Sequence, residues 1–554
     1  MPRFPAPPLN PLRSTLLALA LLPVAAAAWA QAAPDAGQLL QQQRPDARPL
    51  QPSPAAPRVV EAPTRPTVDL PEGAAVQVQG FRITGARSYP LEQLDALVKP
   101  WVGRTLDLKG LNEAAGALTR LYQSGGHLLS YAYLPAQAVQ GGIVEIAVLE
   151  GQVETVQVVT AQEVRLRDAV VQAHTDPITT AQPVLQPDLE RKLLLLNDIP
   201  GVVARGTFAP GASTGGADVI VSVAEDEPLA LRLEADNHGS RSTGEYRAGL
   251  QLHLRDLSGW GDDSTLRATV SNGAGLVSGS VETRWPIGGD GLRLGASLSR
   301  LTYFLAGDFS ALGATGTANT LGVDLEWPLW RSTRGNAWLR GGLDFKRLND
   351  EVRLVGQEHR RSARLLQLGG NGDLRDDWLG GGASAAAATL WVGELRAGGA
   401  GRSDFKKAQL QLARQQSLWG PVSAYARVLA QYTGSNLDSS EKLSLAGPNG
   451  VRAYAPGEAA VDLGRLSSAE LRYGLAHLGG QLTVALFHDQ ASGIVSRGGG
   501  QGNDVRLRGT GLGLQWVGGE LGVSASLAWR GSHEPRAEGG DPRPRLFLQL
   551  FAAP

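Results

Sequence analysis

The 554-residue sequence contains no cysteine and only one methionine. The absence of cysteine excludes disulfide bonds, thiolate metal sites and cysteine nucleophiles. An excess of either charge is also missing, because 52 lysines and arginines are balanced by 53 aspartates and glutamates, for a formal net charge of -1. The chain therefore lacks the basic surplus that neutralises phosphates in nucleic-acid-binding proteins, and no nucleic-acid partner is expected.

Long apolar runs are missing except near the N-terminus. There, an apolar run over residues 16–28 follows Arg3 and Arg13 and leads into the small-residue sequence Ala28-Trp29-Ala30. This pattern is typical of a secretory signal peptide, to which we assign residues 1–30; an uncleaved anchor helix is the alternative. No later run approaches the roughly 18 residues of a spanning helix, so the mature chain can enter a membrane only as a closed barrel.

Recognisable catalytic patterns are missing as well. The eight histidines are scattered, and none pairs with a glutamate at helical spacing as in a zinc-protease helix. We find no nucleophile elbow, phosphate-binding loop or EF-hand loop. The sequence therefore predicts no catalytic residues, no metal site and no cofactor, and we expect a protein that is not an enzyme.

Glycine, in contrast, is abundant at 70 residues, about twice the roughly 7% of an average protein, which favours strands and turns. Residues 31–44 predict a short Leu/Gln-rich helix that we interpret as plug-like, and residues 45–73 a proline-rich, extended linker. Residues 74–151 carry a β-α-α-β-β pattern, which residues 152–227 repeat. Two such units indicate a tandem module.

Four helices and six strands can be located within these two units from their periodicity. The helices are expected near residues 91–98, 111–122, 164–173 and 188–196, and the strands near residues 76–83, 129–134, 143–149, 153–159, 202–208 and 217–223.

From residue 228 to residue 554, helical periodicity gives way to strict alternation. Leu229, Leu231 and Leu233, for example, alternate with Arg232 and Glu234. Segments of this kind, about 10 residues long and bounded by turn residues, are typical of transmembrane barrels with one face to lipid and one to a polar lumen. The region is long enough for 16 strands. The alternative is a soluble β-sandwich or propeller.

Several stretches resemble the TpsB family, the outer-membrane transporters of two-partner secretion. The segments that carry the resemblance are residues 34–40, residues 126–137, residues 189–201, residues 236–244 and, above all, Gly447-Pro448-Asn449-Gly450-Val451-Arg452-Ala453-Tyr454. The resemblance implies a mainly β fold, a 16-stranded barrel preceded by two α/β POTRA domains. It also implies an outer-membrane location with the POTRA domains in the periplasm, contact with outer-membrane lipids, and insertion by the barrel assembly machinery.

The strongest match is the family's lumen loop motif, here Val451, Arg452, Ala453 and Tyr454. Its partner on the barrel wall is expected at Phe487 and Asp489. Strand parity agrees, because leucines at 482 and 486 facing lipid turn Phe487 and Asp489 toward the lumen. A charge-assisted Arg452–Asp489 bond would hold the loop tip to the wall. Ala453 replaces a glycine of the motif, and it would be costly if the backbone there has positive φ.

The same parity turns Glu470 and Arg472 of the preceding strand into the lumen. In the POTRA domains, an extended chain could add to a sheet edge or enter a groove. The edges considered are residues 153–159, with Val156 and Val158, and residues 129–134. The groove is expected along the helix that carries Leu189 and Leu193.

The resemblance implies that the protein secretes a large TpsA-like exoprotein, such as a haemolysin or adhesin, unfolded in the periplasm. Two other functions remain open: an insertase of the BamA type, and a solute channel. The insertase is disfavoured because the sequence shows only two POTRA-like repeats and a long linker. The channel is disfavoured because it gives the repeats no function.

Overall fold

The computed structural model describes residues 33–43, 50–52, 60, 75–178, 185–213, 215–398, 401–499, 503–531 and 544–553. The predicted signal peptide and most of the predicted linker lie outside the described residues. None of the helices in the described ranges has the length and apolarity needed to cross a membrane.

The largest part of the molecule is a closed barrel of sixteen antiparallel strands, as the alternation predicted. Strands that follow one another in the barrel pair in order, and β26 pairs with β9 to close it. They are β9 (Leu229–Asp236), β10 (Arg247–Arg255), β11 (Asp263–Ser271), β12 (Leu276–Ile287), β13 (Leu292–Phe304), β14 (Ala314–Arg331), β15 (Gly335–Val352), β16 (Gln357–Asp376), β17 (Gly382–Ala397), β18 (Gly401–Trp419), β19 (Val422–Thr433), β22 (Leu463–His477), β23 (Gly480–Ile494), β24 (Asp504–Gly518), β25 (Leu521–Arg530) and β26 (Arg545–Ala552).

The two faces of the wall differ as the sequence predicted. On β15, the apolar side chains Leu343 and Phe345 point outward and are 46% and 42% exposed, whereas Lys346 and Leu348 point inward and are buried. An apolar exterior and a polar, filled interior are the pattern of a barrel in a membrane. The mainly β fold class is therefore confirmed.

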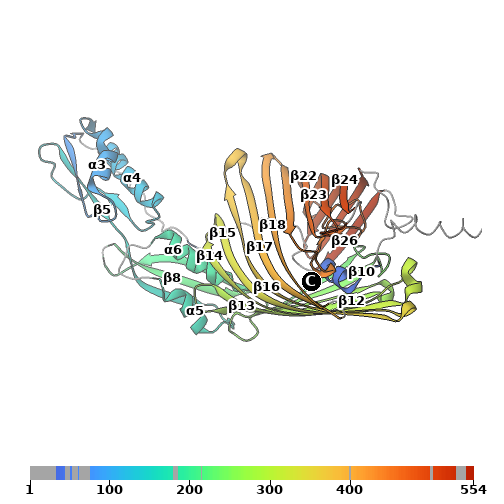
Figure 1. Ribbon diagram of the computed structural model, residues 1–554. Helices are drawn as coiled ribbons and strands as arrows, with labels where there is room; N and C mark the ends of the chain where they lie inside the picture. Colours follow the sequence, from blue (N-terminus) through green and yellow to red (C-terminus); the bar gives the residue numbers. More distant parts are fainter. Residues whose placement is uncertain are drawn as a thin grey trace, which may run out of the picture.

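The barrel wall is uneven in height. Strands β14 to β18 run for 16–20 residues, whereas β9, β10 and β11 run for 8–9. Because roughly 9–11 tilted residues span a bilayer, the longer strands extend beyond the apolar zone. These tall strands form one side of the barrel in Figure 1.

The first module, residues 75–151, is built from three strands against two helices. Its elements are β1 (Val76–Gln77), β2 (Gly80–Thr84), α3 (Leu91–Val98), η2 (Lys99–Trp101), β3 (Thr105–Leu106), α4 (Leu108–Ser124), β4 (Tyr131–Tyr133) and β5 (Ile143–Leu149). The sheet order is β2-β5-β4, with a separate β1–β3 pair. Asp107 caps α4 by accepting from the backbone of Gly110. The predicted strand at residues 129–134 shrinks to β4, because Ser130 donates back to His127 in a turn.

The second module, residues 152–227, repeats this layout. It contains β6 (Gln152–Thr160), α5 (Asp168–Thr175), α6 (Gln186–Asn197), β7 (Val202–Pro210) and β8 (Gly216–Glu225), with sheet order β6-β8-β7. The helix predicted at residues 164–173 begins only at Asp168. The cause is Glu225, whose carboxylate accepts from the backbone N–H groups of Arg165 and Leu166 and holds them in a loop.

The second module docks on the short turns at one end of the barrel, while the first extends away from it (Figure 1). Asp198 at the end of α6 accepts two hydrogen bonds from Arg331 of β14, at 2.7 and 2.9 Å. Lys192 of α6 pairs with Asp290 in the β12–β13 turn at 2.9 Å. The chain passes directly from β8 of the module into β9 of the barrel. Together with this short connection, the two ion pairs fix the angle of the module against the barrel.

A buried carboxyl pair lies at this junction. Asp256, in the β10–β11 turn, is fully buried, and its Oδ1 accepts from the backbone of Gly261. Burial, and then the neighbouring Glu225 carboxylate, raise the pKa of Asp256 from 3.8 to about 6. Because the folded pKa lies above the ordinary value, the stabilising effect of protonation is complete below pH 3.8 and is lost as the pH rises through about 6.

We therefore expect the docked junction to become more stable as the pH falls from 7.5 to 5. Asp256→Asn should stabilise it at pH 7.5 by about 1–3 kcal/mol, since its amide can donate to Glu225 as the protonated acid does. Thermal unfolding or limited proteolysis at both pH values measures this. Asp377→Asn, in the exposed β16–β17 turn, is the control. An Asp256→Asn protein with the wild-type pH slope would contradict the assignment.

Candidate functional site

A long loop between β19 and β22 folds back into the barrel lumen. It carries η7 (Ser439–Glu441), β20 (Leu443–Ser444) and β21 (Ala460–Val461), and β20 pairs with β21. Its apolar side chains Leu445, Val451 and Tyr454 are no more than 1% exposed and share a cluster with Phe487 of the wall. The loop is therefore packed like a protein core, although it lies inside a barrel.

The structure brings the loop residue Arg452 and the wall residue Asp489 into contact, as parity and resemblance had suggested. Two parallel bonds join them: Nε to Oδ2 and one terminal nitrogen to Oδ1, both at 2.8 Å. The backbone N–H of Arg452 also donates to Asp489 at 3.1 Å. Asp489 is fully buried, so this fork-shaped pairing neutralises a carboxylate that has no access to solvent.

The other predicted wall residues complete this contact. The guanidinium of Arg452 lies 3.4 Å from the centre of the Phe487 ring. Glu470 pairs with Arg452 of the loop at 2.9 Å and with Arg472 of its own strand at 2.7 Å, so Arg472 supports the loop contact through Glu470. Sequence reasoning missed Ser468, which donates to Asp489 at 2.6 Å. Its inward position two residues before Glu470 was the available signal.

Arg530 of β25 forms a second clamp that the sequence did not suggest. It donates to the carbonyl of Ala453 at 3.1 Å, pairs with Glu458 at 3.0 Å, and lies 4.4 Å from the Tyr454 ring centre. The loop tip is thus held from two sides of the wall, by β23 and β25.

Ala453 is accommodated without backbone strain. It is not among the described residues with positive φ, so the motif's glycine is not required for conformation here. Its methyl group is 2% exposed and faces Gly509 of β24, where an added Cβ would stand only 2.7 Å away. A glycine on the wall makes room for the alanine in the loop.

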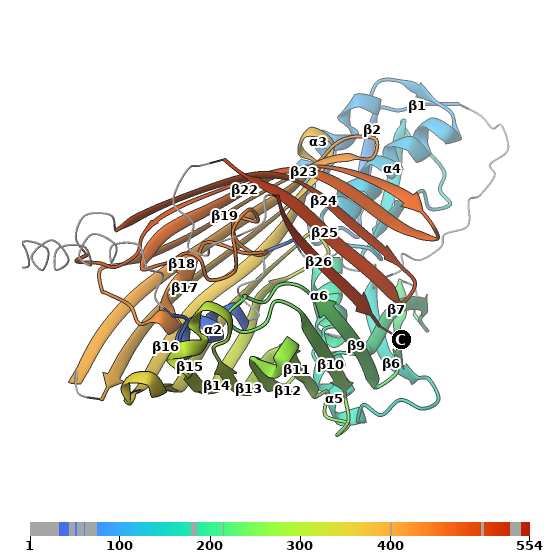
Figure 2. The ribbon, with the colours of Figure 1, turned by 90° about the vertical axis from the view of Figure 1, so that its right-hand side faces the viewer.

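A short helix, α2 (Ala36–Gln43), lies inside the barrel between the wall and the loop (Figure 2). Ala36 and Leu39 are buried against the inward side chains Leu301, Tyr303 and Leu348. Eight residues are too few for a stable isolated helix, so α2 depends on these contacts.

Arg361 of β16 connects α2, the loop and the wall. Its guanidinium pairs with Asp35 at the start of α2 at 3.0 Å, with Asp438 of the loop at 2.6 Å and with Asp350 of β15 at 2.6 Å. Ser439 donates to Asp35 at 2.7 Å and strengthens the tie. The sequence did not point to this junction, because the partners of Arg361 come from separate segments that lie 11, 77 and 326 residues away along the chain.

The base of the loop is anchored by a buried charge triad. Glu441 is fully buried and pairs with Lys346 of β15 at 2.5 Å and with Lys407 of β18 at 2.8 Å. A buried carboxylate between two ammonium groups fixes the position of η7 on the wall.

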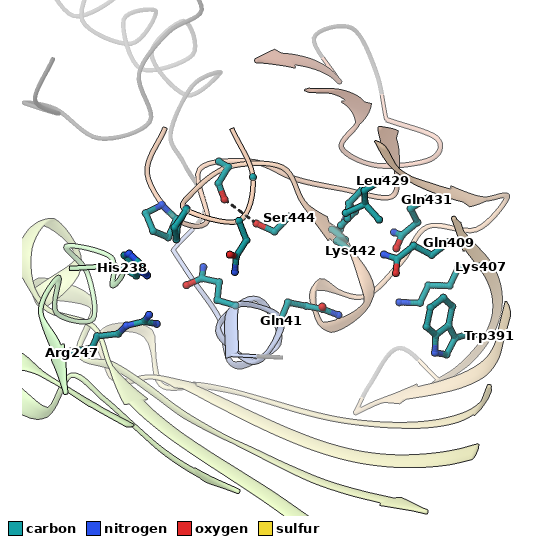
Figure 3. Close-up of a pocket in the computed structure, with 17 residues that line it drawn as sticks. Gln41, His238, Arg247, Trp391, Lys407, Gln409, Leu429, Gln431, Lys442 and Ser444 are labelled. Atoms are coloured by element: carbon teal, nitrogen blue, oxygen red, sulfur yellow. Dashed lines mark hydrogen bonds between the residues drawn. The ribbon is translucent and has the colours of Figure 1, made fainter. Parts of the chain in front are cut away.

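A hollow of about 110 Å³ remains between α2 and the loop, lined by Gln41, His238, Arg247, Lys407 and Ser444 among others (Figure 3). At about 30 Å³ per water in the liquid, this space holds a few water molecules. An extended polypeptide does not fit through this hollow while α2 and the loop are in place.

The candidate residues of the second module separate into two groups. Val156 and Val158 lie on β6, an edge strand of the sheet. Val158 is 39% exposed, whereas Val156 packs against the module's core. Leu189 and Leu193 are only 2% and 1% exposed and belong to the module's core. Their prediction as groove residues is therefore corrected, because the apolar face of α6 packs on the sheet.

The opposite edge, β7, contacts the linker. Val60 forms a parallel bridge to Gly206 of β7 and packs on the module's core. In the parts of the chain that the structure describes, no group of three or more metal-ligating side chains gathers.

Comparisons with known proteins match this geometry. Residues 215–516 match the family "Haemolysin secretion/activation protein ShlB/FhaC/HecB", and residues 76–151 match the ShlB-type POTRA domain. The heme/hemopexin transporter protein HuxB of Haemophilus influenzae is 26% identical over 457 residues, covering 79% of this chain and 80% of that protein. The outer membrane transporter CdiB of Escherichia coli is 25% identical over 418 residues, covering 69% and 66%.

Solved structures show the same fold. CdiB from Escherichia coli aligns with a TM-score of 0.69 at 20% identity, covering 88% of this chain and 92% of that chain. CdiB from Acinetobacter baumannii aligns with a TM-score of 0.61 at 16% identity, covering 93% and 96%. BamA from Haemophilus ducreyi, lacking POTRA domains 1–3, aligns with a TM-score of 0.52 at 11% identity, covering 86% and 100%.

Proposed function

The chain belongs to the haemolysin secretion/activation family ShlB/FhaC/HecB, and from this premise we propose that its exoprotein passes unfolded through the barrel lumen after α2 leaves it. As a member of this family it is an outer-membrane transporter of two-partner secretion, with its POTRA domains in the periplasm. The family consists of transporters and not of enzymes.

The observation that carries the proposal is the way α2 is held. Besides the small apolar face of Ala36, Leu39 and Leu40, its contacts to the wall and loop are polar and exchangeable. They join Asp35 to Arg361, the Gln38 amide to the carbonyl of Gly457 at 2.7 Å, and the Gln41 amide to the carbonyl of Ser440. A helix of eight residues with such contacts can leave as a unit and lose its structure outside. The proline-rich linker gives it the length to do so.

We further propose that the incoming exoprotein docks first on the second POTRA domain by adding a strand to β6. This edge runs for nine residues, and Val158 and Val159 on it are 39% and 53% exposed. Main-chain pairing accepts many sequences, which suits an unfolded cargo. The cargo class we propose is a haemolysin- or adhesin-like exoprotein, in line with the family description and with the heme/hemopexin assignment of HuxB.

An engineered disulfide tests the passage through the lumen. The Ser439 hydroxyl donates to the Asp35 carboxylate at 2.7 Å, so these two side chains face each other. Asp35→Cys with Ser439→Cys should therefore lock the start of α2 to η7, and the chain has no other cysteine to interfere. We expect secretion to stop in the oxidised protein and to return on reduction.

The cargo for this assay is identified by comparing the secreted and outer-membrane proteomes of a deletion strain and its parent. The two single-cysteine variants are the controls, and secretion by the fully oxidised double variant would refute passage through the lumen. Loss of many barrels from the outer membrane of the deletion strain would favour an insertase, and no change in either proteome would favour a channel.

A further inference from the structure

The outer surface of the barrel carries a row of arginines at its extracellular border. We call it the arginine row: Arg300 of β13, Arg347 of β15, Arg396 of β17 and Arg402 of β18. These positions share the outward parity of the neighbouring apolar residues, and all four side chains are exposed. They lie toward the ends of the strands that point away from the POTRA domains.

The strand register aligns these residues side by side. Arg300 pairs with Asn319, and Asn319 with Arg347. Arg347 pairs with Ser362, Ser362 with Arg396, and Arg396 with Arg402. With strands about 4.8 Å apart, the row crosses six strands and is about 24 Å long.

The row begins where the apolar surface ends. The next residues toward the periplasm on three of the strands are Leu298, Leu321 and Phe345, which are 59%, 48% and 42% exposed and lie in register with one another. On β15, outward residues from 337 to 345 are apolar or glycine, a length close to one bilayer crossing. Arg347 follows at once, so the row meets the polar zone of the outer leaflet, where an outward charge costs little.

Positive charge is in excess on this surface. Beyond the apolar zone of β13–β18, the outward cations are Arg300, Arg347, Arg360, Arg364, Arg396, Arg402 and Lys406, and the outward carboxylates are Glu351, Glu358, Glu394 and Asp404. Arg396 and Arg402 share Glu394, at 2.5 and 3.3 Å. Within the described part of the chain, Arg300 and Arg347 form no hydrogen bond or ion pair.

We propose that the arginine row binds the phosphorylated headgroups of glycolipids in the outer leaflet of the outer membrane. The occupant must be anionic, because the surface is cationic. It must also be amphiphilic, because on β13–β15 the row continues directly into the apolar surface. Guanidinium forks pair bidentately with phosphate, which accounts for arginine at all four positions. Asn319 and Ser362 add neutral donors between them.

The test uses the full-length protein in detergent micelles and bisphosphorylated lipid A as the probe, with binding followed by native mass spectrometry. The double variant Arg300→Gln/Arg347→Gln removes the two arginines that hold no internal ion pair, so folding should persist. We expect its affinity for lipid A to fall by roughly tenfold for each arginine. Arg82→Gln/Arg120→Gln, at exposed positions of the first POTRA domain, is the matched control and should bind as wild type.

Three results would overturn the proposal. If dephosphorylated lipid A bound as tightly as bisphosphorylated lipid A, the acyl chains and not the phosphates would account for binding. Equal affinity for inorganic phosphate would make the row a simple anion site. Unchanged lipid A binding by the double variant, with reduced secretion, would assign the surface to the exoprotein instead.

Discussion

Arg452→Ala is expected to abolish most secretion of the partner exoprotein while the barrel still assembles in the outer membrane. The substitution leaves Asp489, which is fully buried, without a cationic partner; Ser468 and the backbone N–H of residue 452 are its remaining donors. Removing one partner of a buried ion pair costs about 3–5 kcal/mol. The loop tip then loses the two side-chain bonds that fix it to β23.

Barrel assembly should survive, because the loop keeps its other anchors. The triad of Glu441, Lys346 and Lys407 holds the loop base, and Arg530 still clamps the tip from β25. Heat-modifiable mobility on gels and surface labelling measure assembly, and immunoblots of the medium measure secretion.

Two companion variants sharpen this experiment. Arg452→Lys keeps the charge but cannot form two parallel bonds to Asp489, so we expect intermediate secretion. Arg241→Ala removes an exposed cation of the β9–β10 loop, which pairs with Glu245 while 40% exposed, and should secrete as wild type. Normal secretion by Arg452→Ala would show that the latch has no part in transport.

Arg361→Ala is expected to open the lumen to ions. Without its guanidinium, three carboxylates remain close together: Asp35 of the helix, Asp438 of the loop and Asp350 of the wall. Their mutual repulsion acts directly on α2, whose short length gives it little stability of its own. A loss of about 3 kcal/mol would raise the population of the open lumen roughly a hundredfold.

Single-channel recordings in planar bilayers measure this effect as more frequent and longer openings. Asp35→Asn removes only the charge on the helix side and should open the lumen less. Arg353→Ala, at a side chain that is 68% exposed, is the control with the same residue type. A closed lumen in Arg361→Ala would mean that apolar packing of Leu39 and Leu40 holds the helix, and would remove Arg361 from the gating mechanism.

Much of this protein follows from the sequence because it rests on local periodicity. Alternation over ten residues predicts a two-faced strand, and sixteen such strands with no free edge must close. The same parity placed Phe487 and Asp489 in the lumen and Glu470 beside them. The alternation of side chains along one strand does not depend on which strands pair with it. These predictions could therefore be made from the sequence.

Tertiary structure decided whatever depends on which segments meet. Helical periodicity marked one face of α6 with Leu189 and Leu193, yet only the packing of the sheet shows that this face is core and not groove. The convergence of Asp35, Asp350 and Asp438 on Arg361 joins residues up to hundreds of positions apart. The arginine row likewise exists only through strand register. Closure of the barrel sets these contacts, because the register of each strand pair determines where the next strand lies. The total register shift around the barrel is not encoded by any local sequence pattern.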